Sequence, residues 1–101
     1  MLEFKRTTNG FNFVFEKKLS AGENVIVKMP PVSANKRGFG DIGWQSDGDV
    51  RLYGTLSRDP EGDNALWQEI NPFDEVNRTV SALKIVNEGN QCEIVIRVLL
   101  N

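Results

Sequence analysis

The fold is decided by residues 44–70, which read W-Q-S-D-G-D-V-R-L-Y-G-T-L-S-R-D-P-E-G-D-N-A-L-W-Q-E-I and hold both tryptophans and the only tyrosine. Apolar and polar side chains alternate here at a period of two, which is the pattern of a strand with one buried face. The apolar face comprises Val50, Leu52, Gly54 and Leu56. Residues 58–64 then form a turn in which a proline and a glycine reverse the chain toward Leu66 and Ile70. We therefore predict two strands joined by an acidic turn.

The chain before this stretch carries further strand patterns. An Asn-Gly pair at positions 9 and 10 is a strong signal for a tight hairpin turn, so we expect a first hairpin over residues 2–16. Residues 17–22 indicate a turn and residues 24–29 a strand, which two prolines end. A loop over residues 30–38 leads to a strand over residues 39–45, whose glycines predict a bulge or the close approach of another backbone.

The chain after residue 70 contains one ambiguous segment. Phe73, Val76, Val80 and Leu83 fit a helical stripe, but β-branched residues favour a strand over residues 79–87. Glu88-Gly89-Asn90 predicts a hairpin turn into a last strand over residues 91–100. One face of that strand holds Cys92, Ile94, Ile96, Val98 and Leu100. Apolar residues on both of its faces indicate that this strand is central in a sheet or covered by another subunit.

Strand patterns with regularly spaced turns predict an all-β protein. We expect one domain over residues 1–101, an antiparallel β-sandwich of seven or eight strands that is jelly-roll-like, with a small closed barrel as the second choice. The chain has no apolar run of membrane-spanning length and does not begin with a signal-peptide pattern, so we expect no membrane partner and synthesis in a cytoplasm.

Composition excludes several classes of function. Twelve basic and fourteen acidic residues give a net charge of -2, too balanced for the basic surface that nucleic-acid binding requires. The chain contains no histidine, which removes the commonest general base and metal ligand. The single cysteine, Cys92, sits in a strand pattern and is predicted to be a small buried hydrophobe. We therefore predict no enzyme activity and no cofactor.

Two groups of residues invite a functional interpretation. Asp59, Glu61 and Asp63 alternate as in a calcium loop, but the glycine is misplaced and no bidentate glutamate follows, so we predict a structural turn and no metal site. Trp44, Tyr53 and Trp67 fit either core packing or an aromatic platform for a sugar or a protein. Tyr53 is the best exposed candidate, because its face of the strand is polar.

The second face of the last strand gives the candidate partner-binding residues. Val95 and Leu99 flank Arg97 there, opposite the apolar face, and a solvated sheet face would carry more polar residues. If subunits pack on this face, the aliphatic side chains are buried and Arg97 pairs with a carboxylate across the interface. We therefore predict that Val95, Arg97 and Leu99 bind a partner, and we add Tyr53, the exposed aromatic candidate, to this set.

Three segments carry a resemblance to a known class of proteins. They are G-W-Q-S-D-G-D-V-R-L-Y-G-T-L at residues 43–56, A-L-W-Q-E-I at residues 65–70 and E-V-N-R-T-V-S-A-L-K-I-V-N at residues 75–87. Together they resemble small β-sandwich virion proteins of tailed bacteriophages, over about the C-terminal 60 of the 101 residues. The resemblance implies a non-enzymatic structural protein that decorates a capsid or builds part of a tail as a homo-oligomer, with a trimer as the first expectation.

This resemblance places the protein in a virion after synthesis in the host cytoplasm, in contact with copies of itself and with a larger capsid or tail protein. Two other functions remain open. One is a carbohydrate-binding module that uses Tyr53 with Trp44 or Trp67, and the other is a small accessory domain that binds a host protein.

Overall fold

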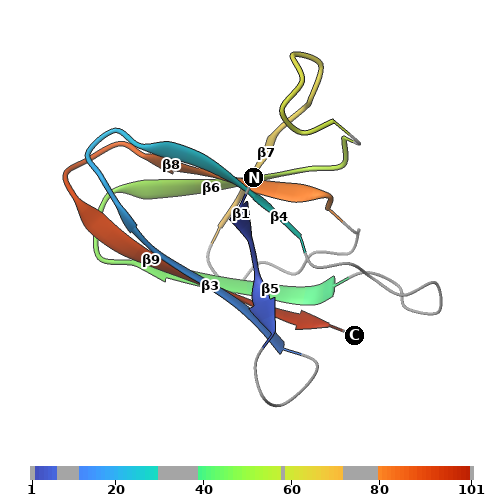
Figure 1. The fold of residues 1–101 in the computed structure, drawn as a ribbon, viewed down its shortest axis with the longest axis horizontal. Helices are drawn as coiled ribbons and strands as arrows, with labels where there is room; N and C mark the ends of the chain where they lie inside the picture. Colours follow the sequence, from blue (N-terminus) through green and yellow to red (C-terminus); the bar gives the residue numbers. More distant parts are fainter. Residues whose placement is uncertain (1, 7–11, 30–38, 58, 72–79, 101) are drawn as a thin grey trace.

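The structure is a computed structural model that describes residues 2–6, 12–29, 39–57, 59–71 and 80–100. Within these residues the chain forms nine strands and no helix, and the strands build two sheets that face each other (Figure 1). The predicted all-β sandwich is confirmed. No helix in the described part of the chain is long and apolar enough to cross a membrane.

One sheet has five strands, in the order β1-β4-β8-β6-β7. Their bounds are Leu2–Glu3 for β1, Asn24–Lys28 for β4, Ala82–Asn87 for β8, Val50–Thr55 for β6 and Gln68–Ile70 for β7. The strands β4, β8, β6 and β7 pair antiparallel, whereas β1 runs parallel to β4. The predicted strand over residues 79–87 is thus found from Ala82 onward.

The other sheet has four strands, in the order β2-β3-β9-β5, all antiparallel. Their bounds are Lys5–Arg6 for β2, Asn12–Leu19 for β3, Cys92–Leu100 for β9 and Phe39–Ser46 for β5. The N-terminal strand crosses from one sheet to the other at Phe4, and this split gives nine strands where seven or eight were expected. The predicted bulge is present as a register shift between Phe39 and Asp41.

Alternating side chains of both sheets form one core between the layers. Its largest fully buried hydrophobic members are Leu19, Val27, Ile42, Leu52, Leu83, Ile85, Ile94, Ile96 and Val98. Burying each of these side chains contributes about 1.5–3 kcal/mol. The last strand, β9, is central in its sheet because β3 pairs with one edge of it and β5 with the other, as its apolar sequence predicts.

The predicted hairpin between residues 79–87 and 91–100 is wrong. The strand β8 lies between β4 and β6, whereas β9 belongs to the other sheet, so the chain crosses the sandwich at residues 88–91. The buried side chain of Asn87 shapes this crossing: its Nδ2 donates to Ser20 O at 2.8 Å and to Asn90 O at 2.9 Å. Its Oδ1 accepts from Gly89 N at 3.1 Å. The side chain of the last residue of β8 therefore bonds to the residues of the crossing and of the β3–β4 turn, and not to a hairpin partner.

Two further predictions need correction. The turn expected over residues 17–22 begins only after Leu19, because Leu19 is fully buried and pairs with Cys92 at the end of β3. Leu56 was expected on the buried face, but it is 54% exposed, because β6 ends at Thr55 and the alternation ends with it. The predicted Asn-Gly turn, the loop over residues 30–38 and most of the ambiguous segment lie outside the described residues.

Candidate interaction surface

The four predicted partner-binding residues do not form one site. Val95 and Arg97 lie together on the outer side of the four-stranded sheet, because Ile94, Ile96 and Val98 point into the core. Leu99 follows on the same strand, paired with Asn12 and Asp41, but its side chain is outside the described part of the structure. Tyr53 lies on the outer side of the five-stranded sheet, on the opposite face of the sandwich.

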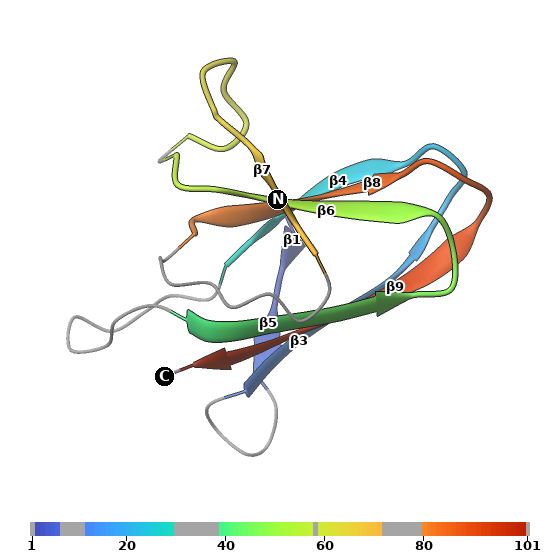
Figure 2. The same cartoon turned by 180° about the vertical axis from the view of Figure 1, so that it is seen from behind.

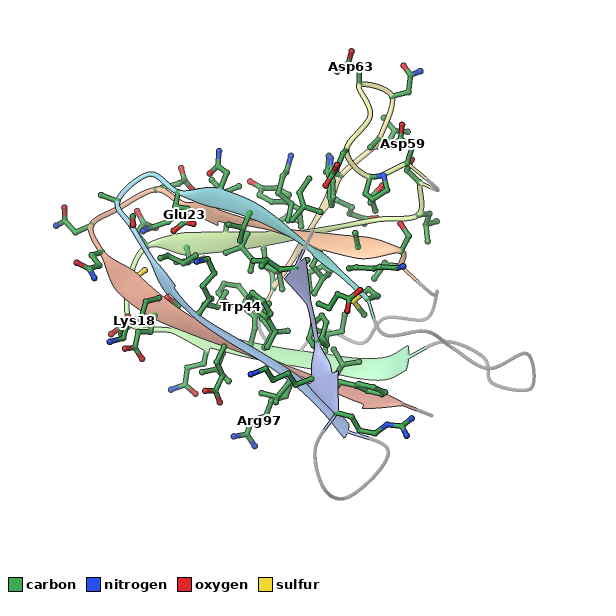
Figure 3. The ribbon with its side chains drawn as sticks, viewed as in Figure 1. Lys18, Glu23, Trp44, Asp59, Asp63 and Arg97 are labelled. Carbon is green, nitrogen blue, oxygen red and sulfur yellow. The ribbon has the colours of Figure 1, made fainter. Side chains whose placement is uncertain are left out.

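We call the outer side of the four-stranded sheet the β9 face. Its outward residues are Val14, Glu16, Lys18, Gly43, Gln45, Asp47, Glu93, Val95 and Arg97. Three rows cross it. Glu16, Val95 and Gln45 share the middle row, with Val14, Arg97 and Gly43 on one side and Lys18, Glu93 and Asp47 on the other. Figure 3 shows Lys18 and Arg97 pointing away from the sandwich on this side.

The middle of the β9 face is partly apolar, with Val14 and Val95 half-buried among exposed charged side chains. Lys18 Nζ lies 4.0 Å from Glu93 Oε1, an exposed pair that contributes little to stability. Arg97 and Glu16 are both exposed, and neither makes a hydrogen bond or ion pair within the described residues. The face therefore offers Arg97 and Glu16, a cation and an anion beside a central valine, without partners for either among the described residues.

A shallow hollow of about 460 Å³ lies over β5 and β9 on this face. Gly43, which has no side chain, and Arg97 line one end of it, Gln45 and Val95 line the middle, and Asp47 and Glu93 line the other end. Asp47 Oδ1 accepts a hydrogen bond from Glu93 N at 2.8 Å, which fixes the two acidic residues side by side. One end of the hollow is thus basic and the other acidic.

We call the outer side of the five-stranded sheet the β8 face. Its outward residues include Asn24, Ile26, Lys28, Arg51, Tyr53, Glu69, Lys84 and Val86. Arg51 NH1 lies 3.4 Å from Glu69 Oε2, and Arg51 Nε pairs with Glu88. Glu88, and then Glu69, raise the pKa of the Arg51 guanidinium above its ordinary value. The arginine of this face is therefore already neutralised within the subunit.

The aromatic residues separate into two environments. Trp44 packs against the core between the sheets, and its Nε1 donates to Ile70 O at 3.2 Å, so it is not part of a surface platform (Figure 3). Lys84 Nζ lies 4.7 Å from the Trp67 ring centre and 5.6 Å from that of Tyr53, a cation–π arrangement. Tyr53 and Trp67 thus share a site on the β8 face, but the lysine ammonium occupies the space beside both rings.

Acidic residues lie in the two loops on either side of β6. Asp47 and Asp49 precede β6, whereas Asp59 and Asp63 follow it on a loop that projects from the sandwich (Figure 2). No group of three or more metal-ligating side chains occurs in residues 2–6, 12–29, 39–57, 59–71 and 80–100. Asp59 O instead accepts from Gly62 N at 3.0 Å, which closes the turn.

Cys92 is buried at the start of β9, as predicted from its position in the strand pattern. A Cβ at Gly48 would lie 2.5 Å from Cys92 Cβ, so this loop glycine allows the chain to pass over the cysteine. Sequence reasoning did not find the acidic pair of Asp47 and Glu93 or the position of Lys84 between two rings. Both features result from the pairing of strands that are distant in the sequence, and alternation alone does not predict which strands pair.

Comparisons with known proteins add no family to this picture. No protein-family model matches the chain, and no curated protein sequence matches it either.

Proposed function

We propose that this protein is a non-enzymatic structural component of a tailed-bacteriophage virion that assembles as a homo-oligomer through its β9 face. The observation that carries the proposal is the half-buried Val95 beside Arg97, whose guanidinium has no partner in the described residues. Interfaces are enriched in arginine and have an apolar centre with a polar rim, and the β9 face has this composition.

The phage assignment rests on the resemblance of residues 43–87 to small virion proteins, which also implies a larger capsid or tail protein as the second partner. The β-sandwich agrees with this class but is shared by many other proteins, so the fold alone supports it weakly. In this proposal the β9 face is the surface that contacts other subunits.

Affinity purification of the tagged chain from the cells that encode it tests the proposal. Mass spectrometry of the co-purified material is expected to identify capsid or tail proteins. A Val95→Glu variant places a charge in the middle of the β9 face and should lose self-association. A Tyr53→Ala variant, altered on the opposite face, should retain it. Recovery of soluble host enzymes, with no shell or tail protein, would contradict the assignment.

A carbohydrate-binding function is the second candidate, because Tyr53 and Trp67 share one site on the β8 face. Sugars stack on the open face of an aromatic ring, however, and here Lys84 lies over both rings. A glycan array separates the two functions: binding that is lost on Tyr53→Ala would favour the carbohydrate-binding module.

A further inference from the structure

The charges of the β9 face are ordered along β9. Glu93 comes first, with Asp47 beside it, Val95 lies in the middle, and Arg97 comes last with Lys5 two strands away in the same row. Outward residues on one strand are about 6.8 Å apart, so the acidic and basic ends are separated by about 14 Å. Lys18 lies on the other side of Glu93 in the same row, so this end carries two carboxylates and one ammonium, whereas the Arg97 end is basic. The face therefore has a net acidic end and a basic end on either side of a valine.

Such a surface is complementary to itself. In an interface with two-fold symmetry, each copy presents the same patch, and a residue on one side of the axis meets a residue from the other side. A two-fold axis that crosses the strands above Val95 places the basic end of each copy on the acidic end of the other. It also places Val95 of one copy against Val95 of the second.

We propose, building on the homo-oligomer proposed above, that two copies pack β9 face to β9 face about this axis. Arg97 of each copy then lies against Glu93 and Asp47 of the second copy. Gly43 lies opposite Asp47 of the second copy in this arrangement, and the hollow over Gly43 provides room for the arginine side chain. The pairing gives Arg97, which has no ion-pair partner among the described residues, two carboxylates to bind.

The size of the face indicates a weak contact. Three strands about 4.8 Å apart and about eight residues long, at about 3.4 Å per residue, cover about 400 Å² on each copy. Specific interfaces bury about 1,200 Å² or more in total, so this pairing, at about 800 Å² in total, falls below that range. The dimer is expected to dissociate with a Kd of about micromolar order.

Glu16 supplies an internal check on the axis. It shares the middle row with Val95, so the axis brings Glu16 of one copy opposite Glu16 of the other. Two like charges across an interface oppose association. Removing this charge with Glu16→Gln is therefore expected to tighten the dimer by a few-fold.

Sedimentation equilibrium on the full chain tests the pairing with charge reversals at exposed positions. Arg97→Glu and Glu93→Arg should each weaken dimerisation about tenfold or more, because each brings like charges together across the interface. The double variant Arg97→Glu, Glu93→Arg should recover most of that loss, since the two reversed charges again meet across the axis. Lys28→Glu is the matched control, an exposed charge reversal on the other sheet that should leave the Kd unchanged.

The outcomes separate this inference from the proposed function. A trimer, or an oligomer that none of these variants weakens, would overturn the two-fold pairing and leave a homo-oligomeric virion protein in place. A double variant no tighter than either single variant would also overturn the pairing. A wild-type chain that stays monomeric at millimolar concentration would overturn both the pairing and self-assembly. Circular dichroism melts of each variant establish that folding is unchanged.

Discussion

The arginines on the two outer faces of the sandwich differ in whether they have partners among the described residues. On the β8 face, Arg51 is paired with Glu69 and Glu88 of the same subunit, and Lys84 lies over two aromatic rings. On the β9 face, Arg97 has no partner among the described residues and lies beside a half-buried valine. An arginine without a partner among the described residues can pair with a carboxylate of another molecule, and the β9 face is therefore the candidate interface.

The largest predicted effect is the loss of stability when a residue of the core between the two sheets is truncated. Leu52 lies under the β8 face and Ile96 under the β9 face, and both are fully buried. Replacing either with Ala leaves a cavity that costs about 2–5 kcal/mol of unfolding free energy. Denaturant titration measures this loss. A cost below about 1 kcal/mol for one variant only would mean that the two sheets do not depend on a common core.

The next prediction compares the arginines of the two faces. Arg51→Ala removes two exposed ion pairs and should lower the melting temperature by only a few degrees, with the difference shrinking in high salt. Arg97→Ala should leave the melting temperature of dilute protein unchanged and weaken self-association. Scanning calorimetry at low and high salt measures the first effect. A lowered melting temperature for Arg97→Ala together with weaker self-association for Arg51→Ala would contradict the proposed roles of the two arginines.

A smaller effect concerns Glu23, in the turn that joins β3 of one sheet to β4 of the other. A hydrogen bond from Ser20 N at 2.9 Å, and then Lys17 at 3.5 Å, lower the pKa of Glu23 below its ordinary value of 4.5. A lowered pKa in the folded state stabilises the protein above the ordinary pKa, and this contribution is lost as the pH falls through the folded-state pKa. Wild type should therefore be more stable than Glu23→Gln at pH 7, and the difference should disappear in acid.

Urea titrations at several pH values measure this difference. A gap between wild type and Glu23→Gln that grows as the pH falls would show that the sign is wrong.

The smallest expected effect is that of calcium on the projecting loop. Asp59 holds this turn through its backbone oxygen, which accepts from Gly62 N. Melting temperatures in excess calcium and in chelator should agree within about a degree, because the loop lacks a complete ligand set. A rise of about ten degrees with calcium would require a metal site that joins this loop.

Period-two alternation in the sequence predicted the buried sides of β3, β6 and β9 correctly, because burial of one sheet face imposes that period. Alternation gave the wrong burial for Leu56, because the strand ends before it. The predicted hairpin between β8 and β9 was also wrong. Glu88-Gly89-Asn90 has the composition of a hairpin turn, and local composition does not specify which sheet the next strand joins. The buried Asn87 that directs the crossing bonds to Ser20, a residue distant in the sequence.

The candidate surface was only partly predictable for the same reason. Alternation placed Val95 and Arg97 outward, but the acidic residue beside Glu93 comes from the loop after β5, through the hydrogen bond from Glu93 N to Asp47. Alternation predicted Tyr53 to be the exposed aromatic candidate, but it did not predict that the register of β6 and β8 places Lys84 beside both Tyr53 and Trp67. Both features depend on strand register, which is set by the whole sandwich.

We propose that copies of this protein pack on the β9 face, and substitutions at two matched valines test this interface. Val95 on β9 and Val86 on β8 are both half-buried on the outer side of a central strand. Light scattering on wild type, Val95→Glu and Val86→Glu compares the two faces at equal protein concentration. If the β9 face is the interface, wild type and Val86→Glu form oligomers and Val95→Glu is a monomer. Dissociation by Val86→Glu, with Val95→Glu still oligomeric, would contradict this proposal.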